Sequence, residues 1–348
     1  MGSGSHLVFL DMVTDPEQAV QLLTEMSRLG ASIQVIALLA GNDPDFILRC
    51  LRAGAIDFLI QPFTGDQIEA AQAKLARLQP TAESAGKEPA KIYAVMPAKG
   101  ACGATTIACN LAFQWKRLGA QRILLADLDS LTGTLSFLLK IKSVHSFLDV
   151  LQRSFELDSD LWNAMVTPVN GIDVLLAPEL MVEGAQDLKD PGPILEYARH
   201  NYDAVVIDAG GVYGEWNLNQ ARLASELLLV TTNELPALQA TQRALSYLDT
   251  NRIGRWKIRL IVNRYHRDVG LSREVIGTAL HTDVFEILPS DYEAVQKSLL
   301  EGKPIAASTA FGKGMIQLAD RLGGRTDPAK KSTSALGGLL GLFSKTSK

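Results

Sequence analysis

The sequence predicts an α/β protein whose main part is a doubly wound, mostly parallel sheet. First, short apolar segments alternate with amphipathic helical patterns along most of the chain. Second, some of these segments are apolar at every position, as in residues 123–126 and 227–230, which suits strands covered by helices on both faces. Third, glycines such as Gly30, Gly54 and Gly119 follow the helical patterns, where glycines commonly end helices.

These patterns also predict the order of the elements. Residues 1–79 contain three strand–helix units, with strands expected at 7–11, 34–40 and 57–60 and helices at 17–29, 44–53 and 64–78. Residues 80–90 are polar, include two prolines and indicate a linker. Residues 91–324 form a second α/β domain, with strands expected at 91–96, 122–127, 172–177, 203–208, 226–231, 257–263 and 284–288. Residues 325–348 form a basic, amphipathic tail.

Composition excludes several classes of protein. The 348 residues are 47% apolar and 21% charged, which is enough to bury a sizeable core. The formal net charge of −4 argues against a protein that coats nucleic acid along its whole surface. The three cysteines, Cys50, Cys102 and Cys109, form neither a disulfide framework nor a metal-ligand spacing. Since the sequence also lacks a long apolar run and a signal-peptide pattern, a cytoplasmic protein is expected.

A glycine-bearing loop follows the strand expected at 91–96. Residues 97–106 read PAKGACGATT, and a helical pattern begins directly after the loop. The backbone N–H groups of such a loop, together with the N-terminus of the following helix, favour binding of phosphate. Thr105 is placed to offer its hydroxyl to Mg²⁺, but a standard phosphate-binding loop has a lysine where this chain has Ala104. The loop alone therefore leaves open a Rossmann-like domain with a chance glycine turn.

Acidic residues end two of the strands expected after this loop. One strand ends in the sequence DLD (residues 127–129), and another runs through apolar residues into Asp208, as in a Walker B element. With Lys99 and Gly100 at the start of the loop, these elements resemble the MinD/ParA superfamily of deviant Walker A ATPases, whose loop reads KGGxGK[TS]. The resemblance implies a P-loop ATPase domain that binds ATP and Mg²⁺ and forms a homodimer with the nucleotides between its subunits.

The same resemblance implies roles for individual residues. Lys99 matches the signature lysine that reaches the partner's nucleotide, Asp129 the acid that orients water, and Asp208 the Walker B acid, so these three are the expected catalytic residues. Thr105, Asp129 and Asp208 are the expected Mg²⁺ ligands. Asn263 matches an asparagine that contacts adenine. The residues expected to bind the nucleotide are Lys99, Gly100, Ala101, Cys102, Gly103, Ala104, Thr105, Thr106, Asn263, Arg264 and Pro289.

A closer resemblance covers most of residues 91–322. Residues 257–304 include IVNRYHRD, LSREVIGTAL and LPSDYEAVQKSLLEGKP, and VTTNELPALQATQRAL precedes them. These segments resemble the TadZ/CpaE family of MinD-like ATPases in tight-adherence (Flp) pilus systems. The resemblance implies an ATP-bound dimer that places pilus-assembly and secretion proteins at a cellular site, such as a pole or the inner membrane. An active ParA/MinD-type ATPase for DNA partition or septum-site positioning is the alternative, and a nucleotide-free scaffold is a third.

Departures from the family loop bear on hydrolysis. With Ala104 in the lysine position, charge on the β- and γ-phosphates has to be neutralised by Mg²⁺, by backbone amides and by Lys99 from a partner subunit. Ala101 also replaces a family glycine, and residues 130–134 lack the carboxamide or acid common there. Slow or negligible hydrolysis of ATP is therefore expected.

Residues 7–78 resemble the second half of a response-regulator receiver, a flavodoxin-like module. Asp11 ends a strand as the phosphoacceptor would, but Gln61 replaces the lysine before Pro62, and Leu39 stands at the position of the switch hydroxyl. Three of the five strands of that fold are expected, and the strand with the acidic Mg²⁺-binding pair is not among them. A degenerate interaction or dimerisation domain that is not phosphorylated is therefore expected.

Six basic residues surround Trp256 and Tyr265: Arg252, Arg255, Lys257, Arg259, Arg264 and Arg267. Alternate residues of a strand point to opposite faces, so a solvated edge is expected rather than a DNA-binding stripe.

The tail carries five basic residues and one acidic residue, and some of its apolar residues share one helical face: Leu336, Leu339, Leu340 and Phe343. Contact of the segment from Ala335 to Lys348 with a membrane is one interpretation. The other is a disordered tail, or a peptide that docks on a partner.

Overall fold

The computed structural model describes residues 6–28, 33–55, 57–65, 67–68, 89–154, 157–188, 190–268 and 270–323. They belong to two compact units: unit 1 contains residues 1–85 with 155–158, and unit 2 contains residues 86–154 with 159–348. The helix expected over 64–78, the linker at 80–90 and the tail at 325–348 lie largely or wholly outside the described residues. Within the described part of the chain, no helix is both long enough and apolar enough to cross a membrane.

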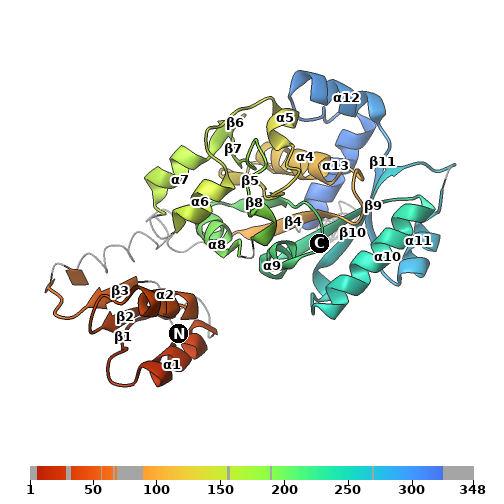
Figure 1. Cartoon of the computed structure of the whole chain (residues 1–348). Helices are drawn as coiled ribbons and strands as arrows, with labels where there is room; N and C mark the ends of the chain where they lie inside the picture. Colours follow the sequence, from red (N-terminus) through yellow and green to blue (C-terminus); the bar gives the residue numbers. More distant parts are fainter. Residues whose placement is uncertain are drawn as a thin grey trace, which may run out of the picture. The chain divides into compact units, whose positions relative to one another are not determined.

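Unit 1 contains a three-stranded parallel sheet in the order β1-β2-β3. Its elements are β1 (His6–Asp11), α1 (Pro16–Arg28), β2 (Ile33–Leu39), α2 (Pro44–Ala53) and β3 (Asp57–Ile60) (Figure 1). Asp43 begins α2 by accepting hydrogen bonds from two backbone N–H groups, and Gly54 ends it in the left-handed conformation, at a φ of 113°. The helices bury Leu23, Ile47 and Cys50 in a common core with the sheet. The three strands are confirmed to within one residue.

Unit 2 is built on an eight-stranded sheet in the order β11-β10-β9-β4-β8-β5-β7-β6. The strands are β4 (Lys91–Pro97), β5 (Ile123–Asp127), β6 (Thr167–Val169), β7 (Ile172–Leu175), β8 (Ala204–Asp208), β9 (Glu226–Thr232), β10 (Ile258–Tyr265) and β11 (Val284–Pro289). All neighbouring strands pair in parallel except β6, which is antiparallel to β7. The mostly parallel sheet is therefore confirmed, and the short edge strand β6 is an element that the sequence analysis does not predict.

Helices cover both faces of this sheet (Figure 1). On one face, α4 (Ala104–Arg117) and α13 (Ala310–Leu322) pack against each other, and α8 (Gly192–Asn201), α9 (Glu215–Leu223) and α10 (Leu235–Thr250) lie on the other. The further described helices are α5 (Leu135–Leu139), α6 (Phe147–Gln152), α7 (Ser159–Met165), α11 (Arg273–Leu280) and α12 (Tyr292–Glu301), with 3₁₀ turns η2 (Ala185–Asp187) and η3 (Arg255–Lys257). Every residue of β5 and β8 is consequently buried.

The strand order reverses direction at β4. The chain runs from β4 to β5 on one side and later crosses from β8 to β9 on the other, so β4 lies between β8 and β9. In doubly wound folds, ligands bind at such a switch point, beyond the carboxyl ends of the strands. The glycine-bearing loop follows β4 at this place.

Asn110 holds α4, the helix that follows this loop, in position. Its side chain is 2% exposed. Its Nδ2 donates to the backbone oxygen of Thr106 at 2.8 Å, and its Oδ1 accepts the N–H of Ile305 at 2.8 Å. Because Ile305 is buried as well, water cannot replace this acceptor. The amide of Asn110 therefore ties α4 to the segment that precedes α13.

The Asn110→Ala substitution is expected to lower the free energy of unfolding by about 1–3 kcal/mol, because the buried N–H of Ile305 loses its acceptor. Urea denaturation followed by tryptophan fluorescence would measure this, since all four tryptophans belong to unit 2. The control is Ser246→Ala, which removes a hydroxyl from the exposed side of α10 and should change stability by less than about 0.5 kcal/mol. Equal effects of the two substitutions would contradict the role of Asn110.

Candidate functional site

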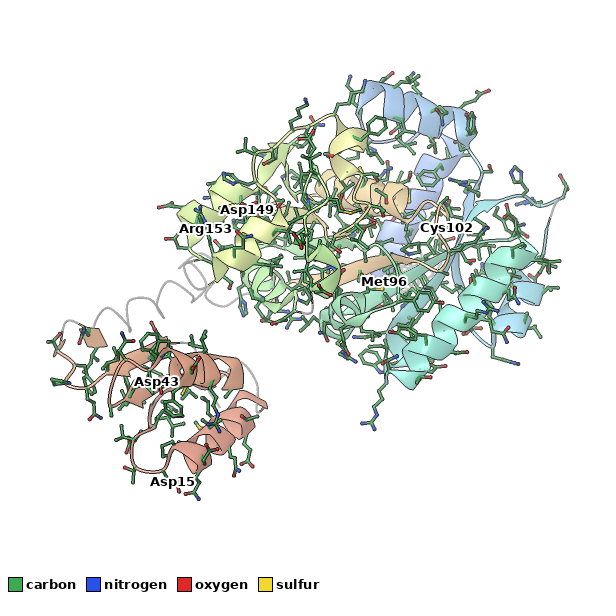
Figure 2. The ribbon with its side chains drawn as sticks, in the orientation of Figure 1. Asp15, Asp43, Met96, Cys102, Asp149 and Arg153 are labelled. Atoms are coloured by element: carbon green, nitrogen blue, oxygen red, sulfur yellow. The ribbon has the colours of Figure 1, made fainter. Side chains whose placement is uncertain are left out.

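The loop between β4 and α4 is anchored on the neighbouring strand β9. The N–H of Ala98 donates to the backbone oxygen of Val230 at 2.9 Å, and the Cys102 thiol donates to the same oxygen at 3.3 Å. Cys102 is buried, and Figure 2 labels it in the loop beyond Met96. Burial raises the pKa of the Cys102 thiol, although hydrogen bonds from backbone N–H groups of the loop oppose this. Cys102 therefore acts as a packing residue around which the loop folds.

Two residues of this loop take the left-handed conformation, Ala101 at a φ of 64° and Gly103 at a φ of 92°. A Cβ atom on Gly103 would lie 2.4 Å from Asn263 Nδ2, so only glycine fits at this position. Alanine costs on the order of 1–2 kcal/mol in this conformation, which glycine would avoid. The alanine at position 101 therefore has a structural cost.

Two buried carboxyl groups lie beside the start of α4. Asp127 ends β5, Asp208 ends β8, and the two residues are partners in the register of these adjacent strands. Their residues are 1% and 2% exposed, respectively. The Thr105 hydroxyl donates a hydrogen bond to the Asp208 carboxylate. The structure thus brings Thr105, from the loop end, together with the acid at the end of β8.

Burial raises the pKa of both carboxyl groups. The pKa of Asp127 rises to about 7, chiefly because of burial, while the N–H of Leu135, which donates to Asp127 at 3.0 Å, lowers it. The pKa of Asp208 rises because of burial and then because of the charge of Asp127, and the Thr105 hydroxyl opposes both effects. A cation beside the two groups would favour their charged forms.

These oxygen atoms suit Mg²⁺. The ion keeps several water ligands and commonly takes one or two protein groups together with substrate phosphates. Thr105 and Asp208 offer a hydroxyl and a carboxylate next to the loop. Among the described residues, no group of three or more His, Cys, Asp or Glu side chains could hold a metal ion. The site therefore suits a Mg²⁺ ion that arrives with a phosphate ligand better than an ion held by protein alone.

Asp129 lies at the same edge of the sheet, and its carboxylate bonds within its own turn. Oδ1 accepts the N–H groups of Leu131 and Thr132 at 3.1 and 2.9 Å, and Oδ2 accepts the Thr132 hydroxyl at 2.6 Å. A Cβ atom on Gly210 would lie 2.6 Å from Asp129 Oδ1. Asp129 therefore packs closely against the loop that follows β8.

The end of β10 supports the loop. Asn263 is 4% exposed, its Nδ2 donates to the backbone oxygen of Cys102 at 2.8 Å, and its Oδ1 has no hydrogen-bond partner among the described residues. Arg264 is exposed at a φ of 51°, and its charge reaches Cys102, whose pKa it lowers against the larger effect of burial. The structure thus brings Asn263 and Arg264 to the loop.

Two other expected site residues are placed differently. Lys99 is exposed, and its side chain makes no hydrogen bond or ion pair with the residues that the structure describes. Pro289 ends β11 opposite Tyr265 and is separated from β4 by two strands. The remaining loop residues expected to contact nucleotide, from Gly100 to Thr106, lie together between β4 and the first turn of α4.

Two residues of this site are not among those expected from the sequence. Asp127 is one, although its position at the end of a buried strand, two residues before Asp129, is a usable signal. Gly133 is the other, and a Cβ atom there would lie 2.8 Å from both Asp127 carboxylate oxygens. This close approach depends on the folded path of the chain, which no local pattern reports.

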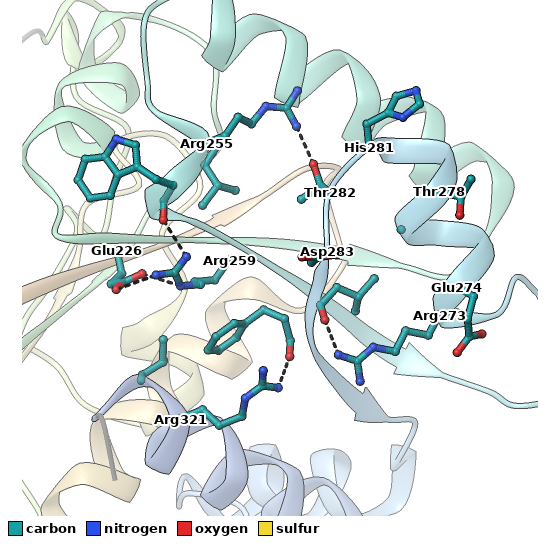
Figure 3. Close-up of a pocket in the computed structure, with 16 residues that line it drawn as sticks. Glu226, Arg255, Arg259, Arg273, Glu274, Thr278, His281, Thr282, Asp283 and Arg321 are labelled. Carbon is teal, nitrogen blue, oxygen red and sulfur yellow. Dashed lines mark hydrogen bonds and ion pairs between the residues drawn. The ribbon is translucent and has the colours of Figure 1, made fainter. Parts of the chain in front are cut away.

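The basic residues near Trp256 do not form one stripe. Lys257 is buried, and its ammonium group donates to two backbone oxygens near the end of α9. Arg255 forms an ion pair with Asp249 of α10. Arg259 forms an ion pair with Glu226 of β9 (Figure 3). Arg264 lies at the opposite end of β10. Arg255, Lys257 and Arg259 are therefore engaged within unit 2.

Figure 3 shows a cavity of about 1140 Å³ whose lining includes four arginines, Arg255, Arg259, Arg273 and Arg321. It lies at the amino ends of β10 and β11, whereas the glycine-bearing loop lies at the carboxyl end of β4. Arg273 and Arg321 donate hydrogen bonds to the backbone oxygens of Val284 and Phe285 in the edge strand β11. The arginines of this cavity are therefore engaged with acids and backbone of the same unit.

The Asp127→Asn substitution is expected to change the pH dependence of stability. The folded chain raises the pKa of Asp127 from 3.8 to about 7, so between these values the folded state holds a proton that the unfolded state has lost. Stability then falls as pH rises through this range. Asparagine still accepts from Leu135 but has no charge to bury. The variant should therefore have a higher Tm than the wild type at pH 8, with a smaller difference at pH 5.

Thermal unfolding in EDTA, which removes divalent cations, would measure these Tm values. The exposed Asp283→Asn substitution is the control and should shift Tm equally at the two pH values. A Tm difference for Asp127→Asn that does not depend on pH, or a wild type that is more stable than the variant at pH 8, would contradict a buried carboxyl group with a raised pKa.

Comparison with known proteins connects this geometry to a superfamily. No protein-family model matches the chain. The septum site-determining protein MinD of Synechocystis sp. is 27% identical over 248 residues, which cover 68% of this chain and 91% of that protein. A ParA family ATPase from Chlorobium tepidum superposes with a TM-score of 0.60 at 22% identity, covering 66% of this chain and 98% of that one.

A MinD structure from Pyrococcus horikoshii, complexed with Mg-ADP, superposes with a TM-score of 0.56 at 21% identity and covers 67% of this chain and 96% of that one. The structural likenesses concern the fold, and the MinD relative adds similarity in sequence over nearly its whole length. The chain is thus similar in sequence to MinD over nearly the whole length of that protein, and similar in fold to ParA and MinD ATPases.

Proposed function

We propose that this protein binds ATP with Mg²⁺, dimerises in the nucleotide-bound state and hydrolyses ATP slowly or not at all. The observation that carries the proposal is the hydrogen bond from the Thr105 hydroxyl to the buried carboxylate of Asp208. Thr105 lies in the first turn of α4, directly after the glycine-bearing loop. When bound, Mg²⁺ would neutralise part of the charge on the nucleotide phosphates. Thr105 and Asp208 would hold that ion, and the MinD of Pyrococcus horikoshii is a structural neighbour solved with Mg-ADP.

Two features of the loop suit phosphate: its backbone N–H groups and the N-terminus of the helix that follows it. α4 is 14 residues long and begins directly after Gly103, so its first N–H groups face the loop and its dipole favours an anion there. Ala104, in the position of the family lysine, is 5% exposed and brings no charge. Lys99 in the loop and Arg264 at the end of β10 supply positive charge near this loop, and both residues are exposed. With less fixed charge at the phosphates, binding is retained better than hydrolysis.

Exposed apolar side chains near the loop support dimerisation. Leu131 follows β5, Tyr213 follows β8 and Leu235 follows β9, and these residues are 49%, 52% and 71% exposed. All three lie beyond the carboxyl ends of their strands, and two of these strands, β8 and β9, flank β4. A second copy that faces this end of the sheet would cover them, and its Lys99 could reach the nucleotide of the first copy. This is the arrangement that the family resemblance implies.

We also propose that the cellular role is to place pilus-assembly and secretion proteins, as in the TadZ/CpaE family. The resemblance of residues 257–304 to that family and the alanine at position 104 support this role. The MinD relatives favour the second candidate, a cycling ATPase that positions a septum or partitions DNA. The paired charges around Arg255 and Arg259 do not favour DNA as a ligand.

Unit 1 would then serve as an interaction module. The carboxylate of Asp11, at the phosphoacceptor position, accepts hydrogen bonds from the Val13 N–H at 2.8 Å and from the Thr14 hydroxyl. These bonds lower the pKa of Asp11, the hydroxyl having the larger effect. The carboxylate is thus engaged within its own turn.

Isothermal titration calorimetry should detect binding of ATP in the presence of Mg²⁺. Thr105→Ala and Asp208→Asn should each weaken this binding at least about tenfold, because each removes one charge-assisted contact. Both substitutions should have little effect in EDTA, which removes Mg²⁺. Thr250→Ala is the control, because it also replaces a threonine by alanine but lies on the exposed side of α10. It should bind ATP as the wild type does. A wild-type chain without heat of ATP binding would overturn the proposal in favour of a nucleotide-free scaffold.

Lys99→Ala should abolish the dimer formed with Mg-ATP while leaving the affinity of the monomer for ATP within a few-fold of the wild type. Light scattering coupled to size-exclusion chromatography measures the dimer, and phosphate release measures turnover. Lys91→Ala, an exposed lysine at the opposite end of β4, is the matched control. Fast steady-state turnover that Lys99→Ala leaves unchanged would be incompatible with the role proposed for this lysine.

A further inference from the structure

Several of the most exposed apolar side chains of unit 2 belong to three neighbouring segments. Phe137 of α5 is 76% exposed, Val144 in the loop after α5 is 92% exposed, and Leu180 and Met181 in the loop after β7 are each 79% exposed. On α12, Leu300 is 74% exposed. Soluble proteins rarely expose a contiguous group of large apolar side chains, and such a group commonly marks an interaction site.

These segments enclose a groove of about 760 Å³. Its lining includes Phe137, Val144, Leu180 and Val182, together with the less exposed Leu176 and Leu299. The groove is distinct from the nucleotide site, since none of its lining residues is among those expected to bind ATP or Mg²⁺.

Hydrogen bonds hold the walls of the groove in place. The N–H of Phe147 donates to the backbone oxygen of Leu176 at 2.8 Å, which joins the start of α6 to the end of β7. The Lys140 ammonium group donates to the backbone oxygen of Leu300, which joins α5 to α12. The groove is therefore formed before any partner arrives, and binding does not have to order its walls.

The polar groups at the rim indicate the charge of the partner. Lys140, Lys142 and His145 line the groove, and Glu179 is the acidic residue among its lining. Lys140 and Lys142 against Glu179 leave the charged part of the lining net positive, beside apolar lining residues, on a chain whose net charge is −4. A ligand with acidic groups beside an apolar face would complement both features.

The shape of the lining indicates the kind of partner. The lining residues come from α5, from α12 and from loops, and none belongs to a strand. A partner strand would therefore find no sheet edge to extend, whereas an amphipathic helix can bind in a groove through side chains alone. We infer that this groove docks an amphipathic helix of another protein that carries acidic residues beside its apolar face.

A peptide library displayed on phage tests this inference with the full chain. The library consists of 16-residue helical peptides. Each position can carry an apolar, an acidic or a basic residue. The selected peptides should carry apolar residues at i, i+3, i+4 and i+7 with aspartate or glutamate beside them. Fluorescence anisotropy of a selected peptide should give an affinity at least tenfold weaker for the double variant Phe137→Asp/Leu180→Asp.

Trp256→Asp is the matched control, because Trp256 is also 76% exposed but precedes β10, at the other end of the sheet. It should bind the peptide as the wild type does. The variants alter exposed side chains, so each should keep the Tm of the wild type, which excludes unfolding as the cause of a lost affinity.

Three results would overturn the inference. The first is a selection that yields no peptide, or yields peptides with basic or uncharged flanks. The second is a selected peptide that binds the double variant as tightly as the wild type. The third is occupation of the groove by this protein itself. If deletion of residues 324–348 raises peptide affinity tenfold, the tail occupies the groove. If the double variant loses self-association that the wild type shows without nucleotide, a second copy occupies it.

Discussion

The burial of two carboxyl groups, Asp127 and Asp208, at the ends of adjacent strands is the constraint on which the site of unit 2 depends. Charge is unfavourable inside a protein, yet a cation site needs charged oxygens. Hydrogen bonds stabilise both buried carboxylates: the N–H of Leu135 donates to Asp127, and the Thr105 hydroxyl donates to Asp208. Gly133 adds room, since any side chain there would meet Asp127. The connection after β5 and the start of α4 are therefore both shaped by these acids.

The loop after β4 keeps its shape through contacts with two other strands. Val230 of β9 accepts from Ala98 and Cys102, and Asn263 of β10 donates to the loop backbone. None of these bonds uses the side chain at position 104. The side chain at position 104 is therefore not an anchor of this loop, and a residue of different charge there would leave these hydrogen bonds in place.

Much of the fold can be predicted because its signals are local. β5 and β9 are apolar at consecutive positions, and the run that leads into Asp208 marks both a strand and the acid at its end. β6 is three residues long, too short for any periodicity to report. The bond from Asn263 to Cys102 joins residues 161 positions apart, so no spacing rule predicts it. The raised pKa of Asp127 is equally out of reach, because burial by other strands decides it.

The two edges of the eight-stranded sheet have a consequence for how this protein behaves at high concentration. At one edge, the side chains of Arg273 and Arg321 occupy backbone oxygens of β11. At the other, β6 offers three residues, and its central Pro168 has no N–H to donate. Both features reduce the number of backbone groups that the eight-stranded sheet offers to a strand from a second molecule. Edge-to-edge growth through this sheet is therefore disfavoured.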